Sequence, residues 1–214
     1  MAQVDFDSLI GIVGYSPVLE CYPLGPRLMS GLERRLAGHA GIVIENMTWG
    51  PVHIVQRFQD VDGPRPKRLV LVGGTSVSNR PGRVTGYRWR GGRLPAQDMQ
   101  ERIYEAVTGI VDIENTLAIG EHFEVWPAEC YAIEADMPFN CFGTMVIADS
   151  QGRAGDAALS NELGFSPAAM IERVCDLAVR LATAEPGQSI DLESKVATSL
   201  ARGASFAKTH FRQH

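Results

Sequence analysis

Short apolar segments with β-strand character alternate with amphipathic helical segments along most of this chain. The strand-like segments are Leu9–Val13, Gly41–Glu45, Arg68–Val72, Arg83–Trp89 and Glu124–Glu134. The helical segments are Leu24–Ala37, Gly50–Phe58, Met99–Val107, Ile113–Ile119 and Ser166–Ala184. Alternating strands and helices imply right-handed crossovers and a sheet covered on both faces. The sequence therefore predicts a three-layer α/β/α fold with a mainly parallel sheet of five or six strands.

Two features refine this prediction. The Ser166-Pro167 pair is a good helix start, because serine caps a helix and proline suits its first position. The interval between Arg68–Val72 and Arg83–Trp89 is too short for a helical crossover. We therefore expect an antiparallel excursion or an edge strand at Arg83–Trp89.

The chain has 214 residues, of which 45% are apolar, and can bury one substantial core. No linker or internal repeat divides it. We expect a single domain over residues 1–184 and a C-terminal extension over residues 185–214, with one more helix at Leu192–Ala201. The extension would end in a frayed tail.

The net charge of −5 argues against a nucleic-acid partner, since phosphate binding needs clustered basic side chains. The one basic cluster, Arg80 to Arg93, alternates with apolar residues and is interpreted as the solvent face of a strand. No apolar run approaches the length of a membrane span, and the first residues do not read as a secretion signal. The scattered cysteines indicate reduced thiols and a cytoplasmic protein: Cys21, Cys130, Cys141 and Cys175.

Candidate chemistry gathers after the predicted strands, where α/β proteins place their ligands. The loop from Gly14 to Gly25 contains one carboxylate, Glu20, which is the candidate catalytic residue. Glu20, Glu105 and His53 are candidate metal ligands, because carboxylate and imidazole groups bind hard or borderline metals. Further carboxylates stand at strand ends: Glu45, Glu134 and Asp136. Helix capping and solvation are competing roles for each of these acids taken alone.

Standard phosphate-binding and serine-hydrolase motifs are absent. Gly73 and Gly74, followed by Thr75 and Ser76, are expected to form a turn after a strand. Such a turn could offer backbone N–H groups to a phosphate, and Gly14, Gly73 and Gly74 are therefore candidate binding residues. A plain flexible turn remains the competing interpretation.

The order of these features resembles the maturation endopeptidases of nickel–iron hydrogenases. The similarity covers about residues 8 to 184, and each matching piece is short. The matching segments, in chain order, are Gly11–Gly14, Gly25–Arg27, Leu69–Gly74, Pro81–Val84, Val107–Gly109, Pro127–Asp136 and Leu163–Pro167.

The resemblance implies a hydrogenase-maturation-protease-like fold and a metalloenzyme precursor as the protein partner. Enzymes of that family bind the nickel of the hydrogenase large-subunit precursor and cleave its C-terminal peptide. They use an acid in the first loop, an aspartate ending the third strand, and a histidine near the middle of the chain. In this sequence Glu20 lies near the first position, whereas Gly73 and Ala106 occupy the other two.

Three hypotheses follow. In the first, which we favour because two of three ligands are missing, the chain binds a precursor and has lost the peptidase reaction. In the second, Glu20, Glu45, Glu105 and His53 rebuild the site, and the protein is an active metal-dependent endopeptidase. In the third, the crevice of the sheet binds a nucleotide or small metabolite.

Overall fold

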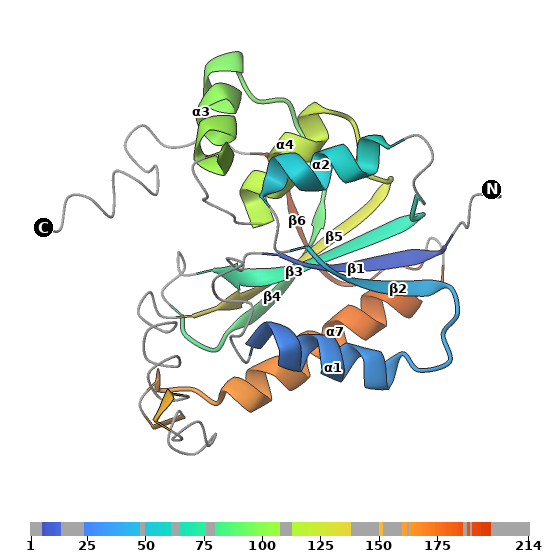
Figure 1. Ribbon diagram of the computed structural model, residues 1–214, viewed down its shortest axis with the longest axis vertical. Helices are drawn as coiled ribbons and strands as arrows, with labels where there is room; N and C mark the ends of the chain where they lie inside the picture. Colours follow the sequence, from blue (N-terminus) through green and yellow to red (C-terminus); the bar gives the residue numbers. More distant parts are fainter. Residues whose placement is uncertain are drawn as a thin grey trace, which may run out of the picture.

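The computed structural model describes residues 6–13, 24–47, 50–60, 65–75, 80–107, 113–137, 150–151, 160–161, 163–185, 188 and 190–197. Its centre is a six-stranded sheet with strand order β2-β1-β3-β5-β4-β6 (Figure 1). The strands are β1 (Ser8–Ile12), β2 (Ile42–Asn46), β3 (Arg68–Thr75), β4 (Val84–Trp89), β5 (Glu129–Asp136) and β6 (Glu193–Lys195). Strands β2, β1, β3 and β5 are mutually parallel, while β4 runs antiparallel to β5 and parallel to β6.

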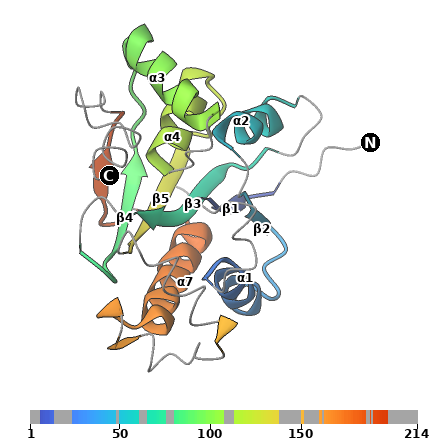
Figure 2. The same cartoon turned by 60° about the vertical axis from the view of Figure 1, so that its left-hand side comes forward.

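Helices cover both faces of this sheet. They are α1 (Leu24–Arg35), α2 (Pro51–Gln59), α3 (Ala96–Val107), α4 (Ile113–His122) and α7 (Pro167–Thr183). Helices α1 and α7 lie on one face, and α2, α3 and α4 lie on the other, as Figures 1 and 2 both show. The three-layer α/β/α fold with a mainly parallel six-stranded sheet is therefore confirmed. No helix in the described ranges is long and apolar enough to cross a membrane.

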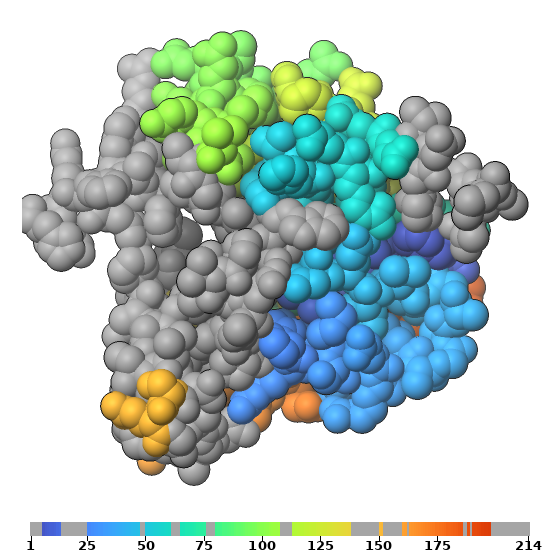
Figure 3. Space-filling view, in the orientation of Figure 1, coloured from blue at the N-terminus to red at the C-terminus, as the bar shows by residue number. Residues whose placement is uncertain are grey.

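The core consists of one apolar layer on each side of the sheet. Successive side chains of a strand point to opposite faces, so Val70 packs toward α1 and α7 while Leu69 and Leu71 pack toward the other helices. Both layers are closed to water, which explains why the parallel strands read as continuous apolar runs rather than alternating ones. Strand β2 is one edge of the sheet and is only partly buried. On the face drawn in Figure 3, parts of both α1 (blue) and α2 (teal) are exposed at the surface.

A buried arginine ties the sheet to the C-terminal end of α7. Arg68 begins β3 and is 5% exposed. Its guanidinium donates to the carbonyl oxygens of Leu181 at 3.0 Å and Ala184 at 2.7 Å, and its Nε donates to Glu129 Oε2 at 2.6 Å. The last carbonyls of a helix have no partner within it, and a cation there also complements the helix dipole. Arg68 therefore supplies the C-terminal cap of α7.

Several predicted elements are corrected by the structure. Strand β4 runs antiparallel to β5, as one of the two predicted alternatives has it, but it is not an edge strand, because β6 pairs with its other side. The strand predicted from Glu124 begins only at Glu129, because Trp126 Nε1 donates to the carbonyl of Leu117 and holds the preceding residues against α4. The helix predicted at Leu192–Ala201 is wrong for residues 192–197, which contain β6. The division at residue 184 stays a prediction.

Candidate functional site

The carboxyl edge of the parallel strands is the candidate site. Thr75 at the end of β3 lies opposite Asp136 at the end of β5, and Ile12 lies opposite Asn46 at the end of β2. Residues from several distant segments therefore meet along one edge. Gly14 and Glu20 lie outside the described residues, so their roles stay predictions.

The third-strand position expected to carry an aspartate is tightly packed. Gly73 lies inside β3 opposite Glu134, and it is buried. A Cβ on Gly73 would lie 2.9 Å from the backbone oxygen of Val13 and 3.0 Å from two side-chain carbons of Ile113. Contacts this short force a shift, and a backbone oxygen yields less readily than the end of a flexible side chain. The structure thus excludes a side chain at residue 73 without rearrangement of its neighbours.

The turn predicted at Gly73 and Gly74 is also corrected. Gly73, Gly74 and Thr75 continue strand β3 and pair in register with β5. The carbonyl of Thr75 accepts a hydrogen bond from the N–H of Met137 at 2.8 Å. A Cβ on Gly74 would overlap the terminal carbon of the Met137 side chain. The open turn that the phosphate hypothesis requires is therefore absent at residues 73–75.

The position expected to carry a histidine is apolar and enclosed. Ala106 is 5% exposed and belongs to a small core between α2, α3 and α4, with Val55, Met99 and Ile119. Glu105, the neighbouring candidate ligand, is also buried, at 7% exposure. A Cβ on Gly50 would lie 3.7 Å from the carbonyl oxygen of Ala106, so the start of α2 lies beside the end of α3.

His53 and Glu45 occupy different environments. His53 lies in the first turn of α2 and is exposed. Glu45 in β2 accepts two hydrogen bonds from Arg57, with Nε–Oε1 at 2.6 Å and Nη2–Oε2 at 2.7 Å. These bonds to Glu45 outweigh burial and raise the pKa of Arg57. Glu45 is therefore engaged in a bidentate ion pair.

The last two strand-end acids also have structural partners. Glu134 Oε1 accepts from the hydroxyl of Tyr87 at 2.7 Å. Asp136 is 2% exposed, and its Oδ2 accepts from the backbone N–H of Arg80 at 2.8 Å. The two acids near the end of β5 are therefore engaged in hydrogen bonds with Tyr87 and with the backbone of Arg80. In the described part of the chain, no three histidine, cysteine, aspartate or glutamate side chains come together in a way that could hold a metal ion.

A charged network on this edge was not predicted from the sequence. Lys195 of β6 places its Nζ 3.0 Å from Glu114 Oε2 and 3.2 Å from Glu134 Oε1. Glu114 also accepts from the nearly buried Arg102, whose Nη2 lies 3.0 Å from Oε1. Burial opposes the charge on Lys195, but the charges of Glu134 and Glu114 outweigh it and raise the pKa of Lys195. The network joins α3, α4, β5 and β6 and leaves Lys195 protonated.

Two solved structures are similar to this chain. One is a hydrogenase 3 maturation protease, with 18% identity, a TM-score of 0.37, and coverage of 75% of this chain and 96% of that chain. Another is a hydrogenase 2 maturation peptidase from a Thaumarchaeota archaeon, with 13% identity, a TM-score of 0.34, and coverage of 69% and 99%. Both are hydrogenase maturation proteases. The ordered sequence motifs resemble the same group.

No protein-family model matches the sequence, and no curated protein matches it significantly. The two structural likenesses have TM-scores below 0.5 and assign no role to any residue of this chain. The strand order establishes the fold, and the contacts described above define the roles of the residues at the sheet edge.

Proposed function

We propose that this protein binds a precursor of the hydrogenase large-subunit kind and does not cleave it. The class of partner is inferred from the order of the sequence motifs over residues 8 to 184, which resembles that of the hydrogenase maturation endopeptidases. The absence of cleavage is supported by one observation above all, the packing of Gly73 against Val13 and Ile113. A family member that recognises nickel in its substrate needs a carboxylate at that position. Here no side chain fits without rearrangement.

The surroundings of Ala106 support the same conclusion. A methyl group cannot coordinate a metal, and Ala106 is enclosed by apolar side chains rather than facing an open site. Metal-assisted peptide cleavage needs several ligands that hold the ion and orient the attacked carbonyl. With Gly73 and Ala106 unable to contribute, Glu20 is the one candidate left from the expected ligand set.

The proposal is tested with a purified nickel-loaded large-subunit precursor. We expect the two proteins to co-elute on size-exclusion chromatography and the precursor to keep its full mass by intact mass spectrometry. Failure to co-elute at micromolar concentrations would refute the partner assignment. Trimming of the precursor C-terminus that disappears in Glu20→Ala would refute the loss of activity and favour the rebuilt endopeptidase with Glu105 and His53.

The variant Glu33→Gln serves as a control in this assay. Glu33 is an exposed acid of α1 that belongs to none of the candidate sites. Glu33→Gln should therefore change neither complex formation nor the mass of the precursor. Residues 73–75 continue a strand where the metabolite-binding hypothesis places a turn, and Ser76 lies outside the described residues.

A further inference from the structure

The two edges of the sheet are protected to different degrees. Strand β6 forms one edge, is only three residues long and carries the charged residues Glu193 and Lys195. Strand β2 forms the other edge, and its segment Ile42–Asn46 contains neither lysine nor proline. Short length, charged side chains and proline are common means by which an edge strand avoids pairing with another chain. The edge at β2 therefore lacks the protection that the edge at β6 has.

Alternate backbone groups of β2 point away from the sheet. The N–H of Met47, directly after β2, donates to the carbonyl of Ile12 in β1 at 2.7 Å. Backbone groups alternate in direction along a strand, so the N–H and carbonyl groups of Ile42, Ile44 and Asn46 point outward. No described strand lies on that side, because β2 ends the strand order. The outward groups are therefore available to another strand.

Apolar side chains accompany this row of backbone groups. Ile42 and Ile44 pack on the α1 side of the sheet, as does Met29 of α1, and all three are only partly buried. The one charged side chain of β2, Glu45, is held by Arg57 in the bidentate ion pair described above. In Figure 1, β2 lies along one side of the sheet, with α2 above it and α1 below it. A strand added here would gain backbone hydrogen bonds and apolar contacts together.

A second copy of β2 matches this edge. A two-fold axis sets two identical strands antiparallel, as in a closed homodimer. With the axis beside Ile44, each Ile44 N–H would donate to the carbonyl of the other Ile44, and each Asn46 N–H to the carbonyl of the other Ile42. The remaining outward donor, the N–H of Ile42, already donates to the carbonyl of His39 at 3.1 Å. Every outward N–H of β2 is therefore satisfied in this register.

We propose that two copies of this protein pair through β2 in this register and join their sheets into one. The two Ile44 side chains then meet beside the axis, and Val43 of each copy faces Glu45 of the other. Like charges directly opposite each other destabilise a strand pair, and this register sets no carboxylate opposite another. A second copy is thus self-complementary in hydrogen bonds, apolar side chains and charge. The dimer is independent of the proposed function, which depends on residues at the carboxyl ends of the strands.

The register is tested by oxidation of an Ile44→Cys variant. Residues of a hydrogen-bonded antiparallel pair have Cα atoms about 5.5 Å apart, which a disulfide can span. We expect copper phenanthroline to convert most of this variant into a linked dimer on a non-reducing gel, above the background that the unmodified protein sets.

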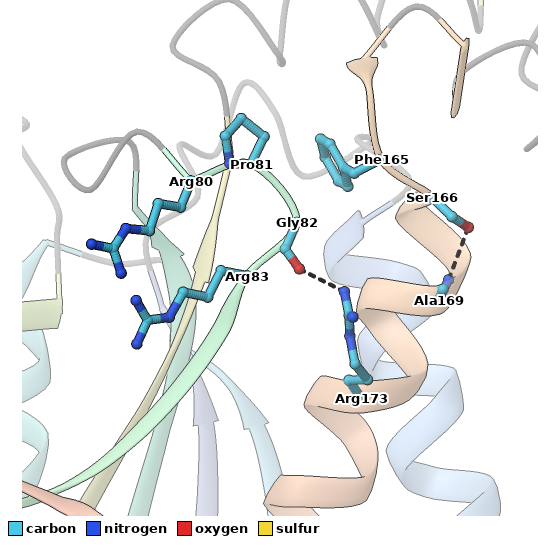
Figure 4. A pocket seen from close by; sticks show the side chains of 8 residues that line it. All are labelled: Arg80, Pro81, Gly82, Arg83, Phe165, Ser166, Ala169 and Arg173. Carbon is cyan, nitrogen blue, oxygen red and sulfur yellow. Dashed lines mark hydrogen bonds between the residues drawn. The ribbon is translucent and has the colours of Figure 1, made fainter.

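Ala169→Cys is the matched control in the oxidation assay. Ala169 is exposed and lies in the first turn of α7, as Figure 4 shows. Arg173 of the same helix donates to the carbonyl of Gly82 at 2.5 Å, which places this part of α7 next to the start of β4. Strands β1, β3 and β5 separate β4 from β2. We therefore expect no more linked dimer from Ala169→Cys than from the unmodified protein.

Association itself is measured by sedimentation equilibrium. At about 100 µM, well above a micromolar dissociation constant, we expect the unmodified protein to have the mass of two chains. Ile44→Lys sets two like charges opposite each other and should weaken association at least tenfold. Asn46→Pro removes an outward N–H, which a lone edge strand tolerates, and should weaken it likewise. Ser194→Lys adds the same charge at the other edge of the sheet and should leave association unchanged.

A mass of one chain for the unmodified protein at this concentration would overturn the proposal, as would equal yields of linked dimer from Ile44→Cys and Ala169→Cys. A dimer that persists in both Ile44→Lys and Asn46→Pro would overturn it too, because association would then use another surface. A monomer that binds the precursor through Ile44 would assign this edge to a different protein. Circular dichroism shows which variants are folded, and Asn46→Pro alone decides the test if Ile44→Lys unfolds the protein.

Discussion

A side chain at residue 73 should destabilise the protein, although alanine normally strengthens a strand. Replacing glycine by alanine gains about 0.4–1 kcal/mol through the entropy of the unfolded chain. The added methyl at 2.9–3.0 Å from Val13 and Ile113 overpacks the site, which costs about 1–3 kcal/mol. The sum for Gly73→Ala is a loss of about 1–2 kcal/mol in the free energy of unfolding. Gly73→Asp adds the burial of a carboxylate and should cost at least about 3 kcal/mol.

Urea unfolding followed by tryptophan fluorescence measures these losses. At this chain length each kcal/mol also corresponds to a shift of roughly 2–4 °C in Tm. Gly50→Ala is the matched control, because a Cβ there meets nothing closer than 3.7 Å and only a weak cap preference is lost, within about 1 kcal/mol. A Gly73→Ala protein as stable as the unmodified one would refute the steric argument.

A double-mutant cycle identifies the group responsible for the clash. Ile113→Val removes the Cδ1 carbon that would lie 3.0 Å from the methyl group of an alanine at residue 73, and it should cost about 0.5–1.5 kcal/mol by itself. In the Gly73→Ala background the same change should cost less, because it also relieves overpacking. Additive losses would show that Cδ1 is not responsible and would leave the Val13 carbonyl and the Cγ1 carbon of residue 113 as the clashing groups.

Further predictions concern three other features, which are Lys195, Arg68 and two buried cysteines. Lys195→Met should lower the free energy of unfolding by about 1–2 kcal/mol, because it leaves Glu134 without its cation and Glu114 with Arg102 alone. The exposed Lys67→Met should change it by less than about 0.5 kcal/mol. Folding raises the pKa of Lys195, so the stability that its charge contributes is complete below the ordinary lysine pKa of about 10.4 and is lost as the pH rises through the pKa of the folded state. The difference in free energy of unfolding between the unmodified protein and Lys195→Met should therefore stay constant from pH 7 to about pH 10 and then shrink. A difference that grows above pH 10 would contradict this prediction. Arg68→Met should cost about 3 kcal/mol or more in the same assay, because the carbonyls that end α7 lose their donor, and a loss under 1 kcal/mol would refute its capping role. Burial raises the pKa of both Cys130 and Cys175, so N-ethylmaleimide should modify these thiols only in urea; modification of either in the native protein, found by peptide mass spectrometry, would contradict their burial.

The layers of the fold could be predicted from the sequence because they depend on local patterns. Apolar runs that end in glycine and the Ser166-Pro167 helix start are visible without any tertiary information. Which strands pair with one another could not be predicted from these local patterns. Nothing in the segment Arg83–Trp89 reveals that β5 lies between β3 and β4, because β5 is contributed by residues some forty positions later.

The candidate site was harder to predict for the same reason. That Gly73 and Ala106 lack ligand groups is a matter of sequence, but the packing that excludes a side chain at residue 73 depends on Ile113, forty residues away. The ion pairs of Lys195 depend on the register between β6 and β4, whereas the sequence pattern around Lys195 favours a helix. No signal in the sequence marks Lys195, because its partly buried position is visible only in the structure.

Strand β6 has a consequence for synthesis of the protein. It is the last described strand in the chain, yet it covers the edge of β4, and Lys195 completes contacts with Glu134 that span 61 residues. A nascent chain that has released only α7 therefore has an open β4 edge, of the kind that recruits strands from other chains. The sheet reaches its final width only when Glu193–Lys195 have left the ribosome, and a pause in translation after Ala184 would prolong the period in which aggregation competes with folding.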